Sequence, residues 1–292
     1  MIDKAGVIGL GIMGSAMAGC MVKKGFEIYG YDVSPKALRR AAKFGVHCKE
    51  TIAECVSKVD IVVCSLPSPE ALTWVCHEII NSADKPLVLI ETSTLTIDDK
   101  LKAKKILKKN NHQLLDCPIS GTGQQALKGD ISVFASGDED SIKKSGPVIS
   151  AFSRENRYCG VFGNGSRMKF VANLLVTIHN TASAEALTLG IKAGLDPALI
   201  FDVISTSAAT SRMFQVRGGM MINNKYDDVG MSNRLYQKDL DIISEFASNL
   251  NCPVNLFQAA LPPYREALKQ GLGEKDTASV FAVLKEQAGI KR

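Results

Sequence analysis

The feature that most constrains the fold is a glycine-rich turn near the start of the chain. The apolar run AGVIGLGIMG carries Gly9, Gly11 and Gly14 in the spacing G-x-G-x-x-G. This pattern predicts a strand over residues 5–10 that turns directly into a helix beginning near Ile12. Such a turn is typical of the first βα unit of a doubly wound sheet, where glycines let helix and strand pack closely.

The same turn indicates a ligand. Backbone N–H groups at a helix start bind phosphate, because they are unpaired and lie at the positive end of the helix dipole. A second apolar run, EIYGYD, ends on Asp32, where an acidic side chain would bond an adenosine ribose. We therefore interpret this region as a dinucleotide site, against the alternative of a purely structural turn. The candidate cofactor residues of the turn are Gly9, Leu10, Gly11, Ile12, Met13 and Gly14.

Asp32 also bears on which dinucleotide binds. Its carboxylate would accept a hydrogen bond from the ribose 2′-hydroxyl and repel a 2′-phosphate, which favours NAD over NADP. Arg39 and Arg40 lie further along the following helix, and we expect them to be too distant to bind that phosphate. NADP is the less favoured alternative.

Composition limits the other partners. With 292 residues, 46% hydrophobic and 22% charged, the chain is typical of a globular protein of two domains. Its apolar stretches are interrupted too often to span a bilayer, and it enters a strand without a leader pattern, so we expect no membrane partner and a cytoplasmic location. The eight cysteines lack a C-x-x-C pair, which predicts reduced, mostly buried thiols, and the four histidines show no metal-binding grouping. We predict no metal.

Much of the net charge of +5 comes from the segment KLKAKKILKKN, residues 100–110. Leu101, Ile106 and Leu107 match one helix face, so we interpret the lysines as the solvated remainder of that helix. A basic patch that attracts anions is the alternative. No aromatic residues interleave with the lysines, so nucleic acid is not an expected partner.

Short β-rich runs alternate with helical patterns up to about residue 160. The predicted strands cover residues 5–10, 27–32, 46–49, 60–67, 87–93, 113–118 and 131–137. The predicted helices begin near Ile12, Ser34, Thr51, Pro69, Thr96 and Glu139. This alternation predicts an α/β fold in which residues 1–162 form a Rossmann-type doubly wound sheet.

The pattern becomes helical after Gly163. One long helix is predicted from Ser166 to Ala193, and further helical segments cover residues 197–206, 232–250, 255–270 and 274–288. Residues 163–292 are therefore predicted to form an all-helical C-terminal domain. The long helix is apolar on much of its circumference, which favours homo-dimerisation.

The loops that follow the predicted strands contain the candidate ligand-binding residues. Ligands of such sheets bind beyond the carboxyl ends of the strands. The loops there contain Leu66, Pro67 and Thr94, and then Ser120, Gly121 and Thr122. The hydroxyls and unhindered N–H groups of the Ser120–Thr122 loop suit a carboxylate, although each loop alone is also compatible with ordinary turn chemistry.

A lysine and an asparagine stand near the start of the long helix. Lys169 and Asn173 are four residues apart, which stacks them on one helix face. The helix dipole disfavours a positive charge at this end, so a neutral amine could take a proton from a substrate hydroxyl as hydride leaves. A solvated lysine beside a surface asparagine is the alternative.

Together these residues resemble the β-hydroxyacid dehydrogenase family. The likeness covers nearly the whole chain and rests on the segments GLGIMGSAM (9–17), DCPISGT (116–122), GNGSRMKFVANLL (163–175) and QKDL (237–240). It implies an oxidoreductase that transfers hydride between nicotinamide and a small 3-hydroxy acid, or its semialdehyde or ketone, and a homo-dimer or homo-tetramer built through the long helices. An imine reductase-like enzyme and a non-catalytic NAD-binding scaffold are the alternatives.

The resemblance also implies residue roles. Lys169 matches the catalytic general acid/base, and Asn173 matches the residue that orients the substrate. The residues implied to bind substrate are Ser120, Gly121 and Thr122. Those implied to line the cofactor are Leu66, Pro67, Thr94 and Lys238, with Asp239 fixing Lys238. Thr122 stands where the family usually has a glycine, which adds a methyl and a hydroxyl group to the implied substrate pocket.

Overall fold

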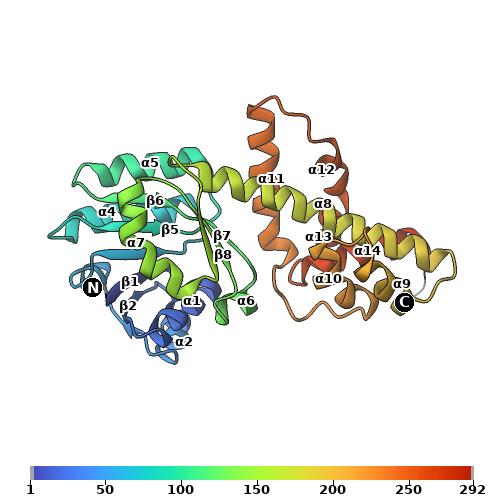
Figure 1. Cartoon of the computed structure of the whole chain (residues 1–292), viewed down its shortest axis with the longest axis horizontal. Coiled ribbons are helices and arrows are strands. Elements are labelled where there is room, and N and C mark those ends of the chain that lie inside the picture. Colours follow the sequence, from blue (N-terminus) through green and yellow to red (C-terminus); the bar gives the residue numbers. More distant parts are fainter. Residues whose placement is uncertain (1–2, 291–292) are drawn as a thin grey trace. The chain divides into compact units, whose positions relative to one another are not determined.

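The structure is a computed structural model that describes residues 3–290. It divides into two compact units, residues 1–169 and residues 170–292. The first is built on a parallel sheet and the second on helices, which confirms the predicted fold class (Figure 1).

The first unit contains a six-stranded parallel sheet in the order β3-β2-β1-β4-β5-β6. In that order the strands are His47–Cys48, Glu27–Tyr31, Lys4–Ile8, Ile61–Cys64, Val88–Glu91 and Gln113–Asp116. The chain moves outward from β1 to β3, returns to β4 beside β1, and continues to β6 on the other side. This reversal creates the crevice at which such sheets bind ligands.

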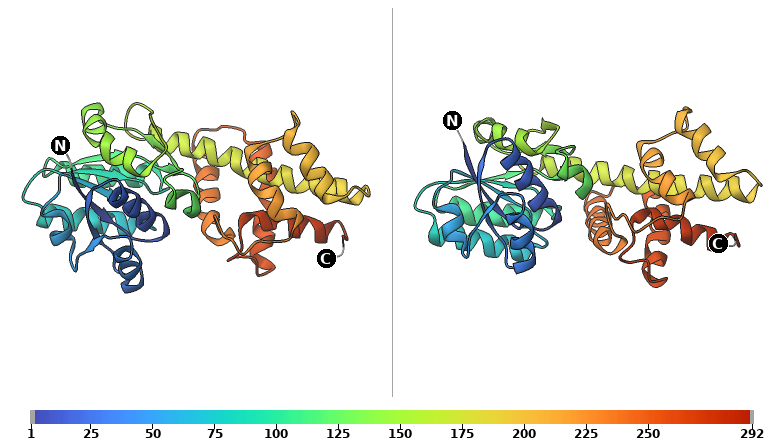
Figure 2. Two further views of the ribbon diagram at one scale, coloured as in Figure 1. Left: turned by 60° about the horizontal axis from the view of Figure 1, so that its bottom comes forward. Right: turned by 90° about the horizontal axis from the view of Figure 1, so that it is seen from below.

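Alternation of side chains divides the core of the first unit into two layers. Along β4, Ile61 and Val63 pack into one layer, whereas Val62 and Cys64 pack into the other. The period of two sends successive residues to opposite faces, so a sheet covered on both sides needs continuous apolar strands. Helices accordingly lie on both faces in Figures 1 and 2. They are α1 (Ile12–Lys23), α2 (Pro35–Ala42), α3 (Ile52–Val56), α4 (Pro69–Ser82), α5 (Ile97–Lys108), α6 (Gly123–Leu127) and α7 (Glu139–Phe152).

A second, three-stranded sheet follows β6. It consists of β7 (Ile119–Ser120), β8 (Ser132–Ala135) and β9 (Glu155–Tyr158), with β8 antiparallel to β7 and parallel to β9. The predicted strand at 131–137 therefore belongs to this small sheet rather than to the main one. A bridge between Asp116 and Ser136 joins the two sheets.

The second unit is helical throughout its described residues. The long helix α8, Asn164–Lys192, begins in the first unit and continues into the second. It is followed by α9 (Pro197–Thr206), α10 (Arg212–Ile222), α11 (Asn233–Asn249), α12 (Asn255–Ala260), α13 (Pro262–Lys269), a short 3-10 turn (Thr277–Ser279) and α14 (Val280–Gln287). Polar side chains of α8 are buried against these helices; Asn180, for example, donates to the Tyr264 hydroxyl at 2.9 Å.

All eight cysteines are free thiols, and five of them are buried. Burial raises the pKa of Cys55 and of Cys76 to about 12, because the thiolate would lose its solvation inside the core. These thiols act as small apolar side chains.

Candidate functional site

The glycines of the β1–α1 turn have distinct physical roles. Gly9 has a φ of +87°, and a Cβ there would lie 2.2 Å from the Ser65 carbonyl oxygen. At Gly14 a Cβ would lie 1.8 Å from the Gly9 carbonyl oxygen. A Cβ at Gly11 would meet no described atom within 4 Å. Two glycines are therefore needed for backbone packing, whereas Gly11 leaves open space beside the turn.

The helix that follows begins without a side-chain cap among the described residues. Gly11 is its N-cap, and the first turn contains no acidic residue. Helices α2 to α7 are each capped by a hydroxyl or carboxylate; the capping residues are Ser34, Thr51, Ser68, Thr96, Thr122 and Asp138. The N–H groups at the start of α1 therefore suit an anionic ligand such as a pyrophosphate.

Asp32 lies at this turn, as its place after β2 predicts. Its Oδ2 accepts from the Leu10 N–H and its Oδ1 from the Ser34 N–H, both at 2.7 Å. These bonds fix the half-buried carboxylate next to the glycine turn. Open space at Gly11, an uncapped α1 and a fixed Asp32 together fit a dinucleotide.

Arg40 lies closer to this turn than its place along α2 suggests, and the expectation that it does not bind a 2′-phosphate stays a prediction. Its guanidinium donates to the Leu10 carbonyl at 2.7 Å and to the Ser15 hydroxyl at 3.0 Å. The side chain is long enough to reach from α2, which packs against α1, so sequence separation along α2 was a poor guide to distance.

The loops after β4 and β5 meet. The Leu66 N–H donates to the Ser93 hydroxyl at 2.8 Å, which places Leu66 beside the residue that precedes Thr94. Pro67 follows in an exposed position. The structure thus brings these predicted cofactor residues to one end of the sheet, as the parallel topology requires.

The Ser120–Thr122 loop lies against the glycine turn. A Cβ at Gly123 would be 2.6 Å from Ile12 Cγ2, so the two loops are neighbours. Gly121 has a φ of +147°, a conformation that other residues rarely adopt. The Thr122 hydroxyl accepts from the Gln125 N–H in a capping box that starts α6. Thr122, the position at which the resemblance leads us to expect a glycine, therefore stabilises the start of α6.

Lys169 and Asn173 are both buried on α8, with side chains that are 8% and 6% exposed. The amide of Asn173 donates to Asp239 Oδ2 at 2.9 Å, and the Tyr236 hydroxyl donates to the Asn173 carbonyl at 3.1 Å. Both partners come from α11, the helix that carries the QKDL segment. Asp239 therefore holds Asn173, a contact that the sequence did not predict, while the neighbouring Lys238 is exposed.

Sequence reasoning missed a buried ionic cluster in the first unit. Lys100 Nζ lies 2.6 Å from Glu91 Oε2 and 2.8 Å from Asp116 Oδ1, and all three side chains are fully buried. The interpretation of residues 100–110 as a solvated lysine face is therefore wrong at its first residue, because α5 turns Lys100 inward and leaves Leu101 46% exposed. The carboxylates of Glu91 and Asp116 are buried next to α5, and their charges compensate for the burial of the Lys100 ammonium.

The charges of this cluster are mutually stabilised. Burial alone would raise the pKa of Asp116, but the Lys100 ammonium and hydrogen bonds from Ser166 outweigh it and hold the pKa below its ordinary value. Burial would likewise lower the pKa of Lys100, but Glu91 and Asp116 outweigh it and raise that pKa. Lys100 and Asp116 therefore keep their charges across the neutral range.

Comparison with known proteins identifies the family. A model described as the NAD binding domain of 6-phosphogluconate dehydrogenase matches residues 4–163, more than half of the chain. A second, described as NAD-binding of NADP-dependent 3-hydroxyisobutyrate dehydrogenase, matches residues 163–284. The chain belongs to the β-hydroxyacid dehydrogenase family.

Relatives within the β-hydroxyacid dehydrogenases match nearly the whole chain. Mouse mitochondrial 3-hydroxyisobutyrate dehydrogenase is 30% identical over 97% of this chain and 87% of its own length. L-threonate dehydrogenase of Haemophilus influenzae is 29% identical over 95% of this chain and 93% of its own. The structure of Mycobacterium tuberculosis 3-hydroxyisobutyrate dehydrogenase with L-serine has a TM-score of 0.88 and 25% identity, and covers 98% of this chain and 100% of the other.

Family membership makes the chain an oxidoreductase with an NAD(P)-binding domain. Within residues 3–290, no group of three or more histidine, cysteine, aspartate or glutamate side chains is placed to hold a metal ion. The helices of this same range are too short or too polar to cross a membrane.

Proposed function

We propose that the chain oxidises a small 3-hydroxy acid to its semialdehyde or ketone, and catalyses the reverse reduction, with Lys169 as the general acid/base. The observation that carries this proposal is the pair Lys169 and Asn173, buried one turn apart on α8 in the family's matching segment. A non-catalytic scaffold would not need a buried lysine there, and imine reduction would not need an oxygen base.

Each residue of the proposed site has a separate role. The bound nicotinamide supplies the hydride chemistry. Lys169 takes the hydroxyl proton during oxidation and returns it during reduction. Asn173, held by Asp239, orients the reacting oxygen. Ser120 and Gly121 bind the carboxylate through a hydroxyl and backbone N–H groups, while Thr122 adds a methyl group that narrows the choice of acid.

We further propose that NAD is preferred over NADP. The fixed Asp32 carboxylate supports this, because it would repel a 2′-phosphate. Arg40 at the same turn supplies a positive charge, and its bonds to the Leu10 carbonyl and the Ser15 hydroxyl tie two of its nitrogens to the turn. Affinities measured for NAD and NADP, in wild type and in Asp32→Ala, test this: the variant should lose the preference for NAD.

A panel of hydroxy acids tests the reaction. The enzyme is incubated with NAD or NADP at alkaline pH and with 3-hydroxyisobutyrate, glycerate, 4-hydroxybutyrate, threonate or serine, and reduced cofactor is followed by absorbance. We expect turnover with at least one acid. Tight cofactor binding without turnover of any acid would favour the scaffold alternative, and turnover of cyclic imines alone would favour the imine reductase.

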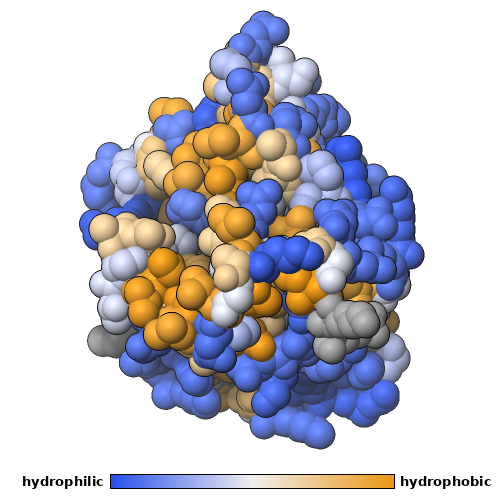
Figure 3. All heavy atoms as spheres, turned by 90° about the vertical axis from the view of Figure 1, so that its right-hand side faces the viewer, coloured by the Kyte–Doolittle hydropathy of each residue, from blue (hydrophilic) through white to orange (hydrophobic). Residues whose placement is uncertain are grey.

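Two expectations about the assembly and its location also stand as proposals. We infer a homo-dimer or homo-tetramer from apolar side chains that are exposed on the helical unit, where Figure 3 shows them gathered on one face. We also infer a reducing compartment such as the cytoplasm, because eight free thiols are typical of one. The domain boundary at residues 162 and 163 remains a prediction.

A further inference from the structure

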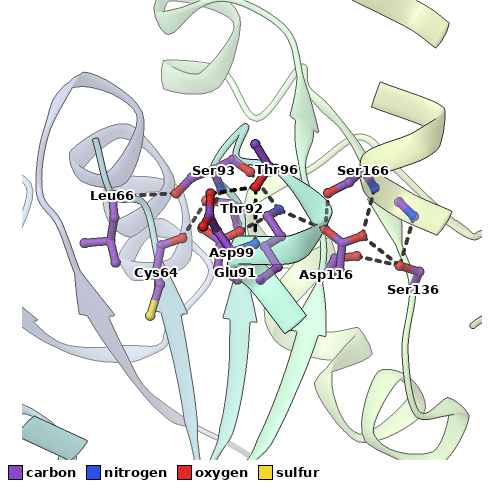
Figure 4. A network of polar contacts seen from close by, with 12 residues as sticks. Cys64, Leu66, Glu91, Thr92, Ser93, Thr96, Asp99, Asp116, Ser136 and Ser166 are labelled. Carbon is purple, nitrogen blue, oxygen red and sulfur yellow. Dashed lines mark hydrogen bonds and ion pairs between the residues drawn. The ribbon is translucent and has the colours of Figure 1, made fainter. Parts of the chain in front are cut away.

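The start of α8 is capped by side chains from distant strands. Gly163, which precedes the helix, has a φ of +95° and no side chain with which to cap it. Instead, the Gly165 N–H donates to the Ser136 hydroxyl at 2.9 Å, and the Ser166 N–H donates to Asp116 Oδ2 at 2.8 Å. Figure 4 shows Asp116 and Ser136 next to this first turn.

The capping carboxylate is itself tightly held. Asp116 Oδ1 accepts from Lys100 Nζ at 2.8 Å and from the Ser166 hydroxyl at 2.7 Å, while Oδ2 also accepts from the Ser136 hydroxyl at 3.1 Å. Asp116, Lys100 and Ser136 are fully buried. Charge-assisted hydrogen bonds of this kind are strong in a low-dielectric interior, so the carboxylate has little freedom to move.

The same network reaches the cofactor loops. Lys100 Nζ donates to the Ser93 carbonyl at 2.8 Å, and the Ser93 hydroxyl accepts from the Leu66 N–H. The Ser93 N–H in turn donates to Glu91 Oε1 at 2.9 Å. A continuous chain of buried polar contacts therefore joins the loop after β4 to the first turn of α8 (Figure 4).

This arrangement is poorly explained by helix stability alone. Helices α2 to α7 of this unit are each capped by the residue next to their first turn, whereas α8 takes its caps from residues about 30 and 50 positions away in the chain. Burying three charges usually adds little net stability, because their desolvation offsets their attraction. What a buried network of charge-assisted hydrogen bonds does provide is one fixed geometry.

We propose that Asp116, Ser136 and Ser166 are positioning residues for Lys169. They fix the first turn of α8 to the sheet, and Lys169 follows Ser166 by three residues, about one helical turn. Through Lys100, the network sets that turn relative to the loop that carries Leu66. This inference rests on the proposed function of Lys169 and extends it to residues that touch neither substrate nor cofactor.

Serine variants test the proposal with little risk to folding. Ser136→Ala and Ser166→Ala remove network hydroxyls, and Ser145→Ala is the matched control, since Ser145 is fully buried in α7 with its hydroxyl unpartnered among described residues. We expect kcat to fall by about 10- to 100-fold in both network variants, as misplacement of a reacting group would cause. The cofactor Kd should stay within about twofold, and Ser145→Ala should match wild type.

A double-mutant cycle separates positioning from a general structural role. In a Lys169→Ala background, Ser136→Ala should lower kcat no further, because its effect passes through the missing amine. An equal fold-loss in both backgrounds, an unchanged kcat in the single variants, or a loss of cofactor affinity that accounts for the loss of rate would overturn the proposal.

Amide hydrogen exchange keeps the test independent of turnover. Amides of residues 165–169 should exchange faster in Ser136→Ala than in wild type or Ser145→Ala, whether or not a substrate is known. Unchanged exchange would refute the anchoring of the turn. If wild type turns over no hydroxy acid while this exchange difference appears, the proposed function fails and the anchor stands.

Discussion

At the scale of single residues, the glycine turn separates backbone requirements from ligand requirements. Gly9 and Gly14 are needed because a Cβ at either would overlap a backbone carbonyl oxygen. Gly11 faces open space, and its φ of −57° lies outside the left-handed region that favours glycine. The G-x-G-x-x-G spacing identifies all three glycines together. The surrounding atoms show that Gly11 is the one beside open space, where we propose that the cofactor binds.

Gly11→Ala should therefore weaken cofactor binding without weakening the fold. We expect at least about a tenfold rise in the NAD Kd, because a methyl group would occupy the space that the pyrophosphate approaches. Isothermal titration and thermal unfolding measure the two effects. Gly146→Ala, which also meets open space but lies in α7, is the control and should change neither cofactor affinity nor activity. Normal affinity in Gly11→Ala would contradict the placement of the cofactor.

The buried Asp116 predicts a pH dependence of stability. Its pKa in the folded state lies below the ordinary 3.8, so the carboxylate stabilises the fold above that pH. This contribution is lost as pH falls from 3.8 through the folded-state pKa. Urea unfolding across the acid range should show a shallower loss of unfolding free energy in Asp116→Asn than in wild type, whereas the exposed Asp98→Asn should keep the wild-type slope. Equal slopes in all three proteins would refute this assignment.

At the scale of elements, the sequence predicts most of the first unit. Every helix start predicted within residues 1–162 lies within one residue of an observed one, because Ser34, Thr51 and Thr96 act as caps and Pro69 starts α4. The strands β7 and β9 were missed, since β7 has two residues and β9 is polar and largely exposed. Helix α10 was missed because Gly218 and Gly219 interrupt its pattern; a Cβ at Gly218 would lie 2.7 Å from the Phe201 ring.

The candidate site was predictable to a similar extent. Residues in local motifs, such as the glycine turn and the Lys169–Asn173 pair, could be selected from spacing alone. The partners that hold them could not, because Asp116 is 50 residues from Ser166 and Asp239 is 66 from Asn173. The burial of Lys100 could not be predicted, because Lys100 begins a lysine-rich run whose pattern is typical of a solvent-exposed helix face.

The short helix α6 tests the structural use of Thr122. Thr122→Ala removes the hydroxyl that caps α6 and should lower the unfolding free energy by about 0.5–2 kcal/mol. Thr122→Ser keeps the hydroxyl and should retain most of that stability while widening the choice of acids. Urea unfolding and the substrate panel measure these effects. If the alanine and serine variants are equally stable, the capping box contributes nothing.

At the scale of the whole molecule, exposed apolar side chains predict self-association. Leu189 on α8 is 73% exposed, and Leu199 and Val203, four residues apart on α9, are each 53% exposed. Neighbouring exposed apolar groups of this kind commonly mark interfaces. The double variant Leu189→Glu and Leu199→Glu should therefore lower the molar mass seen by light scattering. The control Leu256→Glu, at a similarly exposed leucine on α12, should not. A monomeric wild type would contradict the proposed oligomer.

The proposed reaction depends on proton transfer by Lys169. The most direct test therefore measures kcat of Lys169→Ala and of wild type with the best hydroxy acid of the panel. We expect kcat to fall by at least about 100-fold, because general acid–base catalysis typically accelerates a reaction by at least that factor, and we expect the NAD Kd to stay unchanged. Lys102→Ala, an exposed lysine of α5, should retain wild-type turnover. Near-normal turnover in Lys169→Ala, with cofactor binding intact, would contradict the proposed mechanism.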